Sequence, residues 1–154
     1  MVNQNVLLNK VLLTALIIDI FAQLVKPLFF YIKTRKWDFT LFFSSGGFPS
    51  SHSATVTALT TRIAFEYGIS SSLFAISVIF SSIVIFDATG VRQEVGKHSK
   101  TLNDLLHALK MKEQIGFKDL EELIGHSFIE VIGGIFLGIC GSIALLFFPF
   151  FYLK

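Results

Sequence analysis

Hydrophobic positions divide the chain into four apolar segments separated by more polar stretches. The segments cover approximately residues 6–32, 53–67, 71–86 and 128–153. Arg62 and Glu66 interrupt the second segment, and because they are four residues apart they would share one face of a helix, where they can pair. A helix needs about 20 apolar residues to cross a bilayer. We therefore expect the second segment to be hidden among the other three.

The connections between these segments differ in length and polarity. Residues 68–71 form a short link, which predicts that the second and third segments are an antiparallel helical hairpin. The connection over 91–125 is long and polar, and its stretch TLNDLLHALKMK has leucines at helical spacing. This pattern predicts an amphipathic helix lying on the membrane surface or on the bundle. The sequence thus predicts one all-α domain over 1–154, a transmembrane helical bundle of about four spans.

The composition favours a membrane protein. The chain is 53% hydrophobic and 16% charged, with a mean hydropathy of +0.68, whereas soluble domains contain about 25% charged residues. An unusually apolar soluble bundle is the alternative. A net charge of +2 is too small to indicate a nucleic-acid partner. Cys140 lies in an apolar run, so we expect it to be a small buried hydrophobe.

The positive charges predict an orientation. The first and third connections hold nine Lys and Arg residues: Lys33, Arg35, Lys36, Arg92, Lys97, Lys100, Lys110, Lys112 and Lys118. The opposite side has only Lys10 and Lys154. Loops rich in Lys and Arg stay in the cytoplasm. We therefore expect a protein of the cytoplasmic (bacterial inner) membrane with both termini outside.

The unusual polar residues of all four segments fall on the basic side. They are Gln23 and Lys26 at the end of the first segment, the stretch GGFPSSHSA (46–54) before the second, Asp87, Gly90 and Arg92 after the third, and His126 and Glu130 at the start of the fourth. Ionisable residues at membrane depth are costly and usually functional. The pattern predicts one site at one end of the bundle, facing the cytoplasm.

The stretch GGFPSSHSA has the features of an anion site. Ser50, Ser51 and the backbone N–H groups around His52 are expected at a helix N-terminus, where free N–H groups and the helix dipole favour negative charge. Gly46 and Gly47 let the backbone bend toward a ligand. These residues therefore predict one wall of a phosphate site.

Charged and titratable residues from the other segments extend this chemistry. Lys26 and Arg92 add positive charge, and arginine can bind phosphate oxygens in a bidentate manner. His126 and Glu130 are four apart, so the carboxylate can orient the imidazole as a nucleophile or base. His52 can supply a proton to a leaving group. This set suits phosphoryl transfer from a phosphate ester without a metal or other cofactor.

Three motifs resemble those of a known family. Pro49-Ser50-Ser51-His52 resembles the Pro-Ser-Gly-His motif of the phosphatidic acid phosphatase type 2 superfamily, which includes the vanadium haloperoxidases, and His126-x-x-x-Glu130 is similar to its His-x-x-x-Asp motif. The stretches GGFPSSHSA, DATGVRQEVGKH and GHSFIEV, in this order, more closely resemble the divergent bacterial and plant branch. The resemblance covers essentially the whole chain.

The resemblance implies a helical bundle with its site at one membrane face. It implies that His126 is a nucleophile forming a phosphohistidine, that Glu130 orients it and that His52 is the general acid. It also implies that Ser50 and Ser51 bind phosphate. Together with the headgroup depth of the site, it favours a membrane lipid phosphate or pyrophosphate, including isoprenoid phosphates, as substrate.

The chain departs from the superfamily pattern at several positions. Leu120 stands six residues before His126, where the superfamily has an arginine, and Ser51 replaces the motif's glycine. The first superfamily motif, a lysine followed by Arg-Pro, is absent, and Lys26 is the reasonable stand-in. Arg92 can offset the missing arginine.

Structural alternatives remain for each of these residues. Ser50 can be a plain helix cap, His126 and Glu130 a structural pair, and Asp87 with Arg92 a salt bridge closing the third segment. Lys26 can extend to the headgroups. We favour Asp87 as an orienter of Arg92 or Lys26, with Gly46, Gly47 and Gly90 in supporting roles.

Two further functions compete with a phosphatase. A non-catalytic membrane protein can retain the anion pocket to bind lipid headgroups or a partner, and the missing arginine favours it. A metal or haem site built from His52, His98, His107 and His126 ranks last, because their spacing matches no usual ligand motif.

Overall fold

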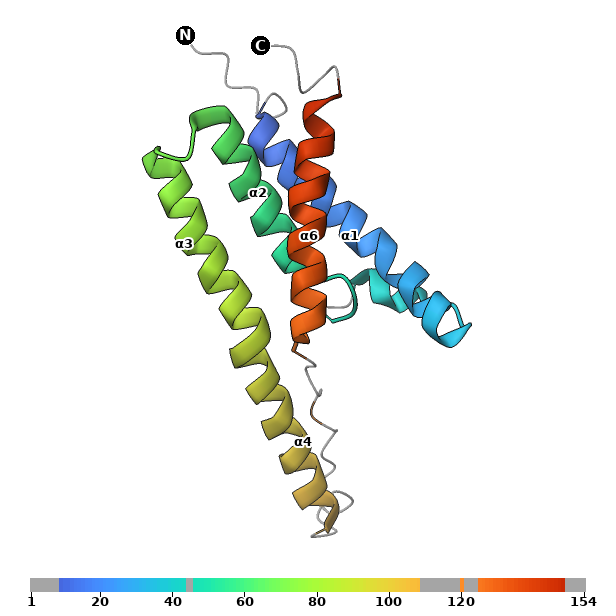
Figure 1. The fold of residues 1–154 in the computed structure, drawn as a ribbon. Helices are drawn as coiled ribbons and strands as arrows, with labels where there is room; N and C mark the ends of the chain where they lie inside the picture. The colour runs from blue at the N-terminus through green and yellow to red at the C-terminus, as the bar shows by residue number, and fades with distance from the viewer. Residues whose placement is uncertain (1–8, 44–45, 109–119, 121–124, 149–154) are drawn as a thin grey trace.

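The computed structural model of the chain describes residues 9–43, 46–108, 120 and 125–148. Within these ranges the protein is helical and has no strand, which confirms the predicted all-α bundle (Figure 1). The α-helices are α1 (Lys10–Thr34), α2 (Ser51–Tyr67), α3 (Ser72–Phe86), α4 (Arg92–Ala108) and α6 (Phe128–Leu146). A 3₁₀-helix, η2 (Phe39–Phe43), follows α1, and a π-helical turn, η3 (Asp87–Val91), joins α3 to α4.

Helix α2 lies at the centre of the bundle and packs against α1, α3 and α6. Its contact with α1 includes small residues: Ala54 and Ala58 are fully buried and pack with Ile18 and Ala22 of α1. Small side chains let helix backbones approach closely, as they do in membrane proteins. The prediction that the second segment is hidden among the others is therefore confirmed.

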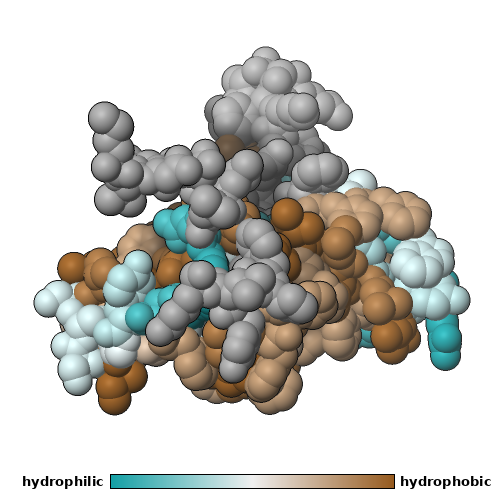
Figure 2. All heavy atoms as spheres, turned by 90° about the horizontal axis from the view of Figure 1, so that it is seen from above, coloured by the Kyte–Doolittle hydropathy of each residue, from teal (hydrophilic) through white to brown (hydrophobic). Residues whose placement is uncertain are grey.

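Three helices are long and apolar enough to cross a membrane: Lys10–Thr34, the continuous helix Ser72–Ala108, and Phe128–Leu146. Helix α2, with 17 residues, lies among them. Many large apolar side chains on these helices are exposed, Leu24, Ile79 and Phe136 among them. Figure 2 shows hydrophobic residues over much of the visible middle of the molecule, with hydrophilic ones toward its two sides. Such a surface suits a lipid environment.

The third segment differs from its prediction in how it ends. Helix α3 stops at Phe86, as expected, but the chain stays helical through η3 and continues as α4 (Figure 1). The predicted amphipathic helix over 101–112 thus begins earlier, at Arg92, and residues 109–112 lie outside the described ranges. Leu102 and Leu105 are exposed and Leu106 is half-buried, so the described part of the apolar stripe of α4 is largely uncovered.

Helix α6 turns a narrow face toward the bundle. Its buried residues are Val131, Gly134, Gly138 and Ser142, three or four positions apart along one side. Cys140 lies outside this spacing and is exposed. The prediction that Cys140 is buried is therefore wrong, because an apolar run in a membrane helix does not specify which side faces the protein.

Candidate active site

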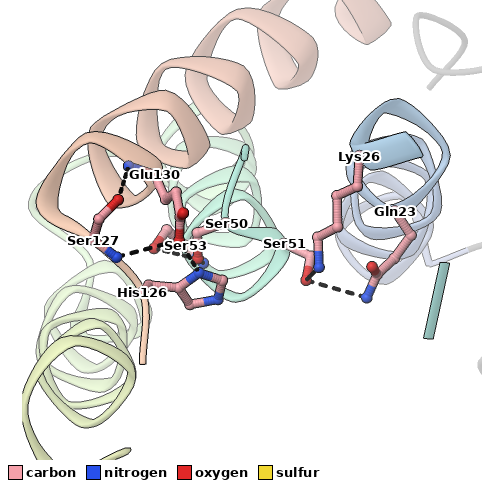
Figure 3. Close-up of polar contacts among 8 residues, drawn as sticks. All are labelled: Gln23, Lys26, Ser50, Ser51, Ser53, His126, Ser127 and Glu130. Carbon is pink, nitrogen blue, oxygen red and sulfur yellow. Dashed lines mark hydrogen bonds and ion pairs between the residues drawn. The ribbon is translucent and has the colours of Figure 1, made fainter. Parts of the chain in front are cut away.

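The start of α6 holds a histidine and a carboxylate in fixed positions. Ser127 caps the helix, and its Oγ accepts a hydrogen bond from the Glu130 N–H at 3.4 Å. Glu130 Oε2 accepts one from the Ser127 N–H at 3.2 Å and lies 3.0 Å from His126 Nδ1 (Figure 3). Because a carboxylate oxygen accepts hydrogen bonds, this contact favours the tautomer in which the Nδ1–H group donates to Glu130. This capping box also orients the imidazole.

The backbone of His126 is fixed by the π-helical turn. Its N–H donates to the carbonyl oxygen of Ala88, in η3, at 3.0 Å. π-Helical turns are rare and often mark functional sites. The His126 side chain is 3% exposed, and its Nε2 atom is buried with no hydrogen-bond partner among the residues that the structure describes. Nε2 is therefore the ring atom left to react or to bind a ligand.

The first turn of α2 adjoins this pair. Ser50 is fully buried and caps α2, accepting bonds from the N–H and the hydroxyl of Ser53 at 3.3 and 3.1 Å. Its own N–H donates to the Glu130 carbonyl oxygen at 2.9 Å, which ties the N-termini of α2 and α6 together. The imidazole centroids of His52 and His126 lie 5.8 Å apart. Two histidines distant in sequence therefore meet at this end of the bundle.

The opposite side of this turn faces α1. Lys26 is 1% exposed, and its Nζ donates to Ser51 Oγ at 3.4 Å. Gln23 Nε2 donates to the same oxygen at 3.2 Å (Figure 3). Lys26 therefore does not extend to the headgroups but turns inward, where a buried cation needs a partner. Gly47 has φ +94°, a conformation that favours glycine, and lies beside the Lys26 side chain.

Other residues predicted for the site lie around it. Asp87 is half-buried at the start of η3, and Gly90 lies in the same turn. Gly46 is half-buried in the loop before α2. The backbone of Arg92 begins α4, and its side chain lies outside the described part of the protein. The pairing of Asp87 with Arg92 or Lys26 therefore stays a prediction.

The position of the superfamily arginine has a different role here. The N–H of Leu120 donates to Asn103 Oδ1, and Asn103 Nδ2 donates to the Leu120 carbonyl oxygen, both at 3.0 Å. Asn103 is buried in α4. These bonds attach Leu120 to α4. His98 and His107 are exposed on α4 and do not join His52 and His126.

Sequence reasoning missed two parts of this site. Ser127 was a readable signal, because Ser-x-x-Glu before an apolar run is the pattern of a capping box. A bond from Thr55 Oγ1 to Asp19 Oδ1, at 2.8 Å, extends the polar contacts between α1 and α2. Only the packing of the two helices brings these residues together, so spacing alone does not predict the pair.

A cavity of about 400 Å³ opens beside the polar residues. Its lining comes from the second half of α1, from η2, from the loop before α2 and from α6: Lys26, Phe29, Phe30, Ile32, Lys33, Leu41, Gly47, Phe48 and Glu130. Because Lys26 and Glu130 both reach it, the cavity connects the α1 and α6 sides of the site.

Outward-facing apolar helices around one buried polar end define an integral membrane protein. The chain belongs to the Divergent PAP2 family, whose family model matches residues 7–141. It is also similar to the "uncharacterized membrane protein YuiD" of Bacillus subtilis, with 44% identity over 155 residues, covering 94% of this chain and 98% of that protein. No solved structure matches the chain. The predicted family is therefore confirmed.

Proposed function

We propose that this protein is a membrane phosphatase or phosphotransferase acting on a lipid-linked phosphate or pyrophosphate through a phosphohistidine. The observation that carries the proposal is the state of His126. Its Nδ1 is bound by Glu130, its ring is buried, and its Nε2 has no partner within the described ranges. A base oriented by a second group, with its reactive atom unoccupied, is the arrangement that nucleophilic catalysis needs. Membership of the Divergent PAP2 family supports it.

The first chemical step forms a nitrogen–phosphorus bond. His126 Nε2 attacks the phosphorus of the ester, and the bond from phosphorus to the ester oxygen breaks. The leaving oxygen takes a proton from protonated His52, whose ring adjoins that of His126. The phosphorylated imidazole keeps its Nδ1 proton and is cationic, so the Glu130 carboxylate stabilises it.

The second step returns the enzyme to its starting state. Neutral His52 takes a proton from water as the water oxygen attacks phosphorus, and the nitrogen–phosphorus bond breaks. The net reaction converts ester and water into alcohol and phosphate. An alcohol in place of water would give phosphotransfer. No step in this scheme uses a metal or other cofactor.

Two groups would bind the phosphate oxygens during these steps. The first is the N-terminus of α2, where the N–H groups after Ser50 and the Ser51 hydroxyl lie near Lys26. The second is Arg92, through its guanidinium. The Lys and Arg distribution supports a site that faces the cytoplasm, in a protein of the bacterial inner membrane.

The test is phosphate release by purified protein in lipid nanodiscs. Its substrates are phosphatidate, isoprenyl phosphates and pyrophosphates, and a soluble ester. His126→Ala should abolish turnover, because no other group takes the place of Nε2. His107→Ala is the matched control, since this histidine is exposed on α4, and it should retain wild-type rates. Acid-labile ³²P on wild-type protein and not on His126→Ala would identify the intermediate.

A second candidate is an anion-binding membrane protein without turnover. The observation that favours it is Leu120, an apolar residue at the position of the superfamily arginine, with its backbone bonded to Asn103. In that case no substrate would release phosphate, and His126→Ala would retain binding of inorganic phosphate. Release from any substrate that depends on His126 would reject this candidate.

A further inference from the structure

The cavity beside the site has an amphiphilic lining. Phe29, Phe30 and Ile32 of α1 and Leu41 of η2 form apolar walls together with Phe48. The Phe48 ring packs edge-on against Phe29, with centroids 4.7 Å apart. The walls of the cavity are therefore largely aliphatic and aromatic.

The cavity is lined by two lysines and one glutamate, which lie at different distances from the polar site. Lys26 and Glu130, which line it, also belong to the polar site, and Lys26 is bonded to Ser51. Lys33 is seven residues further along α1 and is exposed. Seven residues span about 10 Å along a helix. The apolar walls thus begin beside the buried polar residues and extend toward an exposed lysine at the end of α1.

This arrangement fits one kind of ligand, an anion attached to an apolar chain. We propose that the cavity binds the first part of the hydrocarbon chain of a phosphate monoester, while the phosphate lies between Lys26 and His126. This inference rests on the proposed function and names the part of the substrate that the enzyme recognises. A volume of about 400 Å³ is near the lower end of ligand-sized cavities, roughly 300–1,000 Å³, so it accommodates one chain.

The first arm of the test fills the cavity. Leu41→Trp adds a large side chain to the lining, and the substrates are dodecyl phosphate and methyl phosphate, which share a headgroup. We expect kcat/KM for dodecyl phosphate to fall about tenfold or more and kcat/KM for methyl phosphate to change less than about twofold, because methyl phosphate has no chain to bury in the cavity. Leu24→Trp is the matched control, since Leu24 is exposed on α1 and outside the lining.

The second arm does not need turnover. His126→Ala protein in nanodiscs is photolabelled with dodecyl phosphate that carries a diazirine near the phosphate, and labelled residues are located by mass spectrometry. We expect label on Phe29, Phe30, Leu41 or Phe48 and less label in Leu41→Trp/His126→Ala. Label confined to outward faces such as that of α3, or no label, would overturn the inference.

The two arms separate this inference from the proposed function. Turnover of both esters with no effect of Leu41→Trp, and no label in the cavity, would reject the chain site and leave the phosphatase intact. Labelling in the cavity without turnover of any ester would reject the phosphatase and retain an amphiphile-binding site. An equal loss with Leu24→Trp would show that the effect of Leu41→Trp is not specific to the cavity, and would overturn the inference.

Discussion

The first turn of α2 contacts two neighbours in very different ways. Toward α6 the contact is dense: the Ser50 N–H bonds the Glu130 carbonyl, and Gly134 leaves no room for a side chain against the Ser50 backbone. Toward α1 the contact is sparse: Ser51 meets Lys26 and Gln23 at 3.4 and 3.2 Å, and a cavity lies beside them.

In the proposed phosphatase, this difference would separate two tasks of one site. A nucleophile needs a fixed position, because small displacements cost large factors in rate. A ligand needs room and a counter-charge. Under this proposal the α6 side would fix the nucleophile through Glu130, and the α1 side would supply the counter-charge and the room through Lys26 and the cavity. We expect substitutions on the α6 side to affect the rate of the chemical step, and those on the α1 side to affect ligand affinity.

The largest effect is expected from Glu130→Gln. Glutamine can still cap α6, so the helix should form, but it cannot stabilise a cationic imidazole. We expect kcat to fall about 10²–10⁴-fold, the range found for general acid–base groups, with little change in the unfolding temperature. Steady-state or stopped-flow assays of phosphate release measure this change in kcat.

Ser127→Ala is the matched control for Glu130→Gln. It removes the cap and leaves the bond between His126 and Glu130, at a cost of about 1 kcal/mol in the free energy of unfolding. If the two variants lost activity equally, the α6 side would act through helix stability and not through the orientation of His126.

The next effect tests the packing of the α6 side. A Cβ at Gly134 would overlap the Ser50 carbonyl oxygen and approach Ser53 Cβ within 2.9 Å, so Gly134→Ala must push α2 and α6 apart. We expect a loss of about 1–3 kcal/mol in the free energy of unfolding. In Gly141→Ala the overlap is with the end of the flexible Ile18 side chain, so this control should be nearly neutral. Denaturation in detergent micelles measures both.

The sequence predicted the polar end of the bundle well, and for a physical reason. Lys26, His126 and Glu130 are costly residues for a membrane segment, so their presence at the ends of apolar runs was itself a signal. The spacing of His126 and Glu130 predicted a pair on one helical face, and this is wrong in detail: His126 precedes the Ser127 cap of α6 and meets Glu130 from outside the helix. The hidden position of α2 followed from its length and from Arg62 and Glu66, which pair at 2.5 Å.

Other features depended on contacts that spacing does not encode. The carbonyl of Ala88 bonds His126 because α3 continues through a π-helical turn, which the stretch DATGV did not reveal. The inward direction of Lys26 depends on how α1 packs against α2. The exposed position of Cys140 depends on which side of α6 is buried, and an apolar run gives no information on this point.

A smaller effect is expected from Lys26→Met. We expect this substitution to weaken phosphate binding without lowering the stability of the fold. Methionine keeps the length of the side chain and removes a buried charge, so the free energy of unfolding should stay constant or rise. The affinity for inorganic phosphate should fall roughly tenfold or more, because a hydrogen bond to a charged group contributes about 1.5–3 kcal/mol.

Titration calorimetry with phosphate measures the affinity of Lys26→Met, and thermal unfolding measures its stability. A loss of stability with unchanged phosphate affinity would make Lys26 a structural residue. In that case the α1 side would not be the ligand-binding side of the site.

The smallest effect is expected from Asp19→Asn. Thr55 Oγ1 lies 2.8 Å from both Asp19 Oδ1 and the Ser51 carbonyl oxygen, and its single hydroxyl hydrogen is shared between these two acceptors. Asp19 is therefore two contacts away from the proposed phosphate site. Asparagine retains an acceptor oxygen and can keep this bond, so KM for a phosphate ester should change less than about threefold. Thr55→Val removes the donor and leaves the carboxylate in an apolar contact, and should cost more stability than Asp19→Asn. If Asp19→Asn instead changed KM as strongly as Lys26→Met, the charge of Asp19 would be part of the ligand site, and the α1 side would extend half-way along the helix.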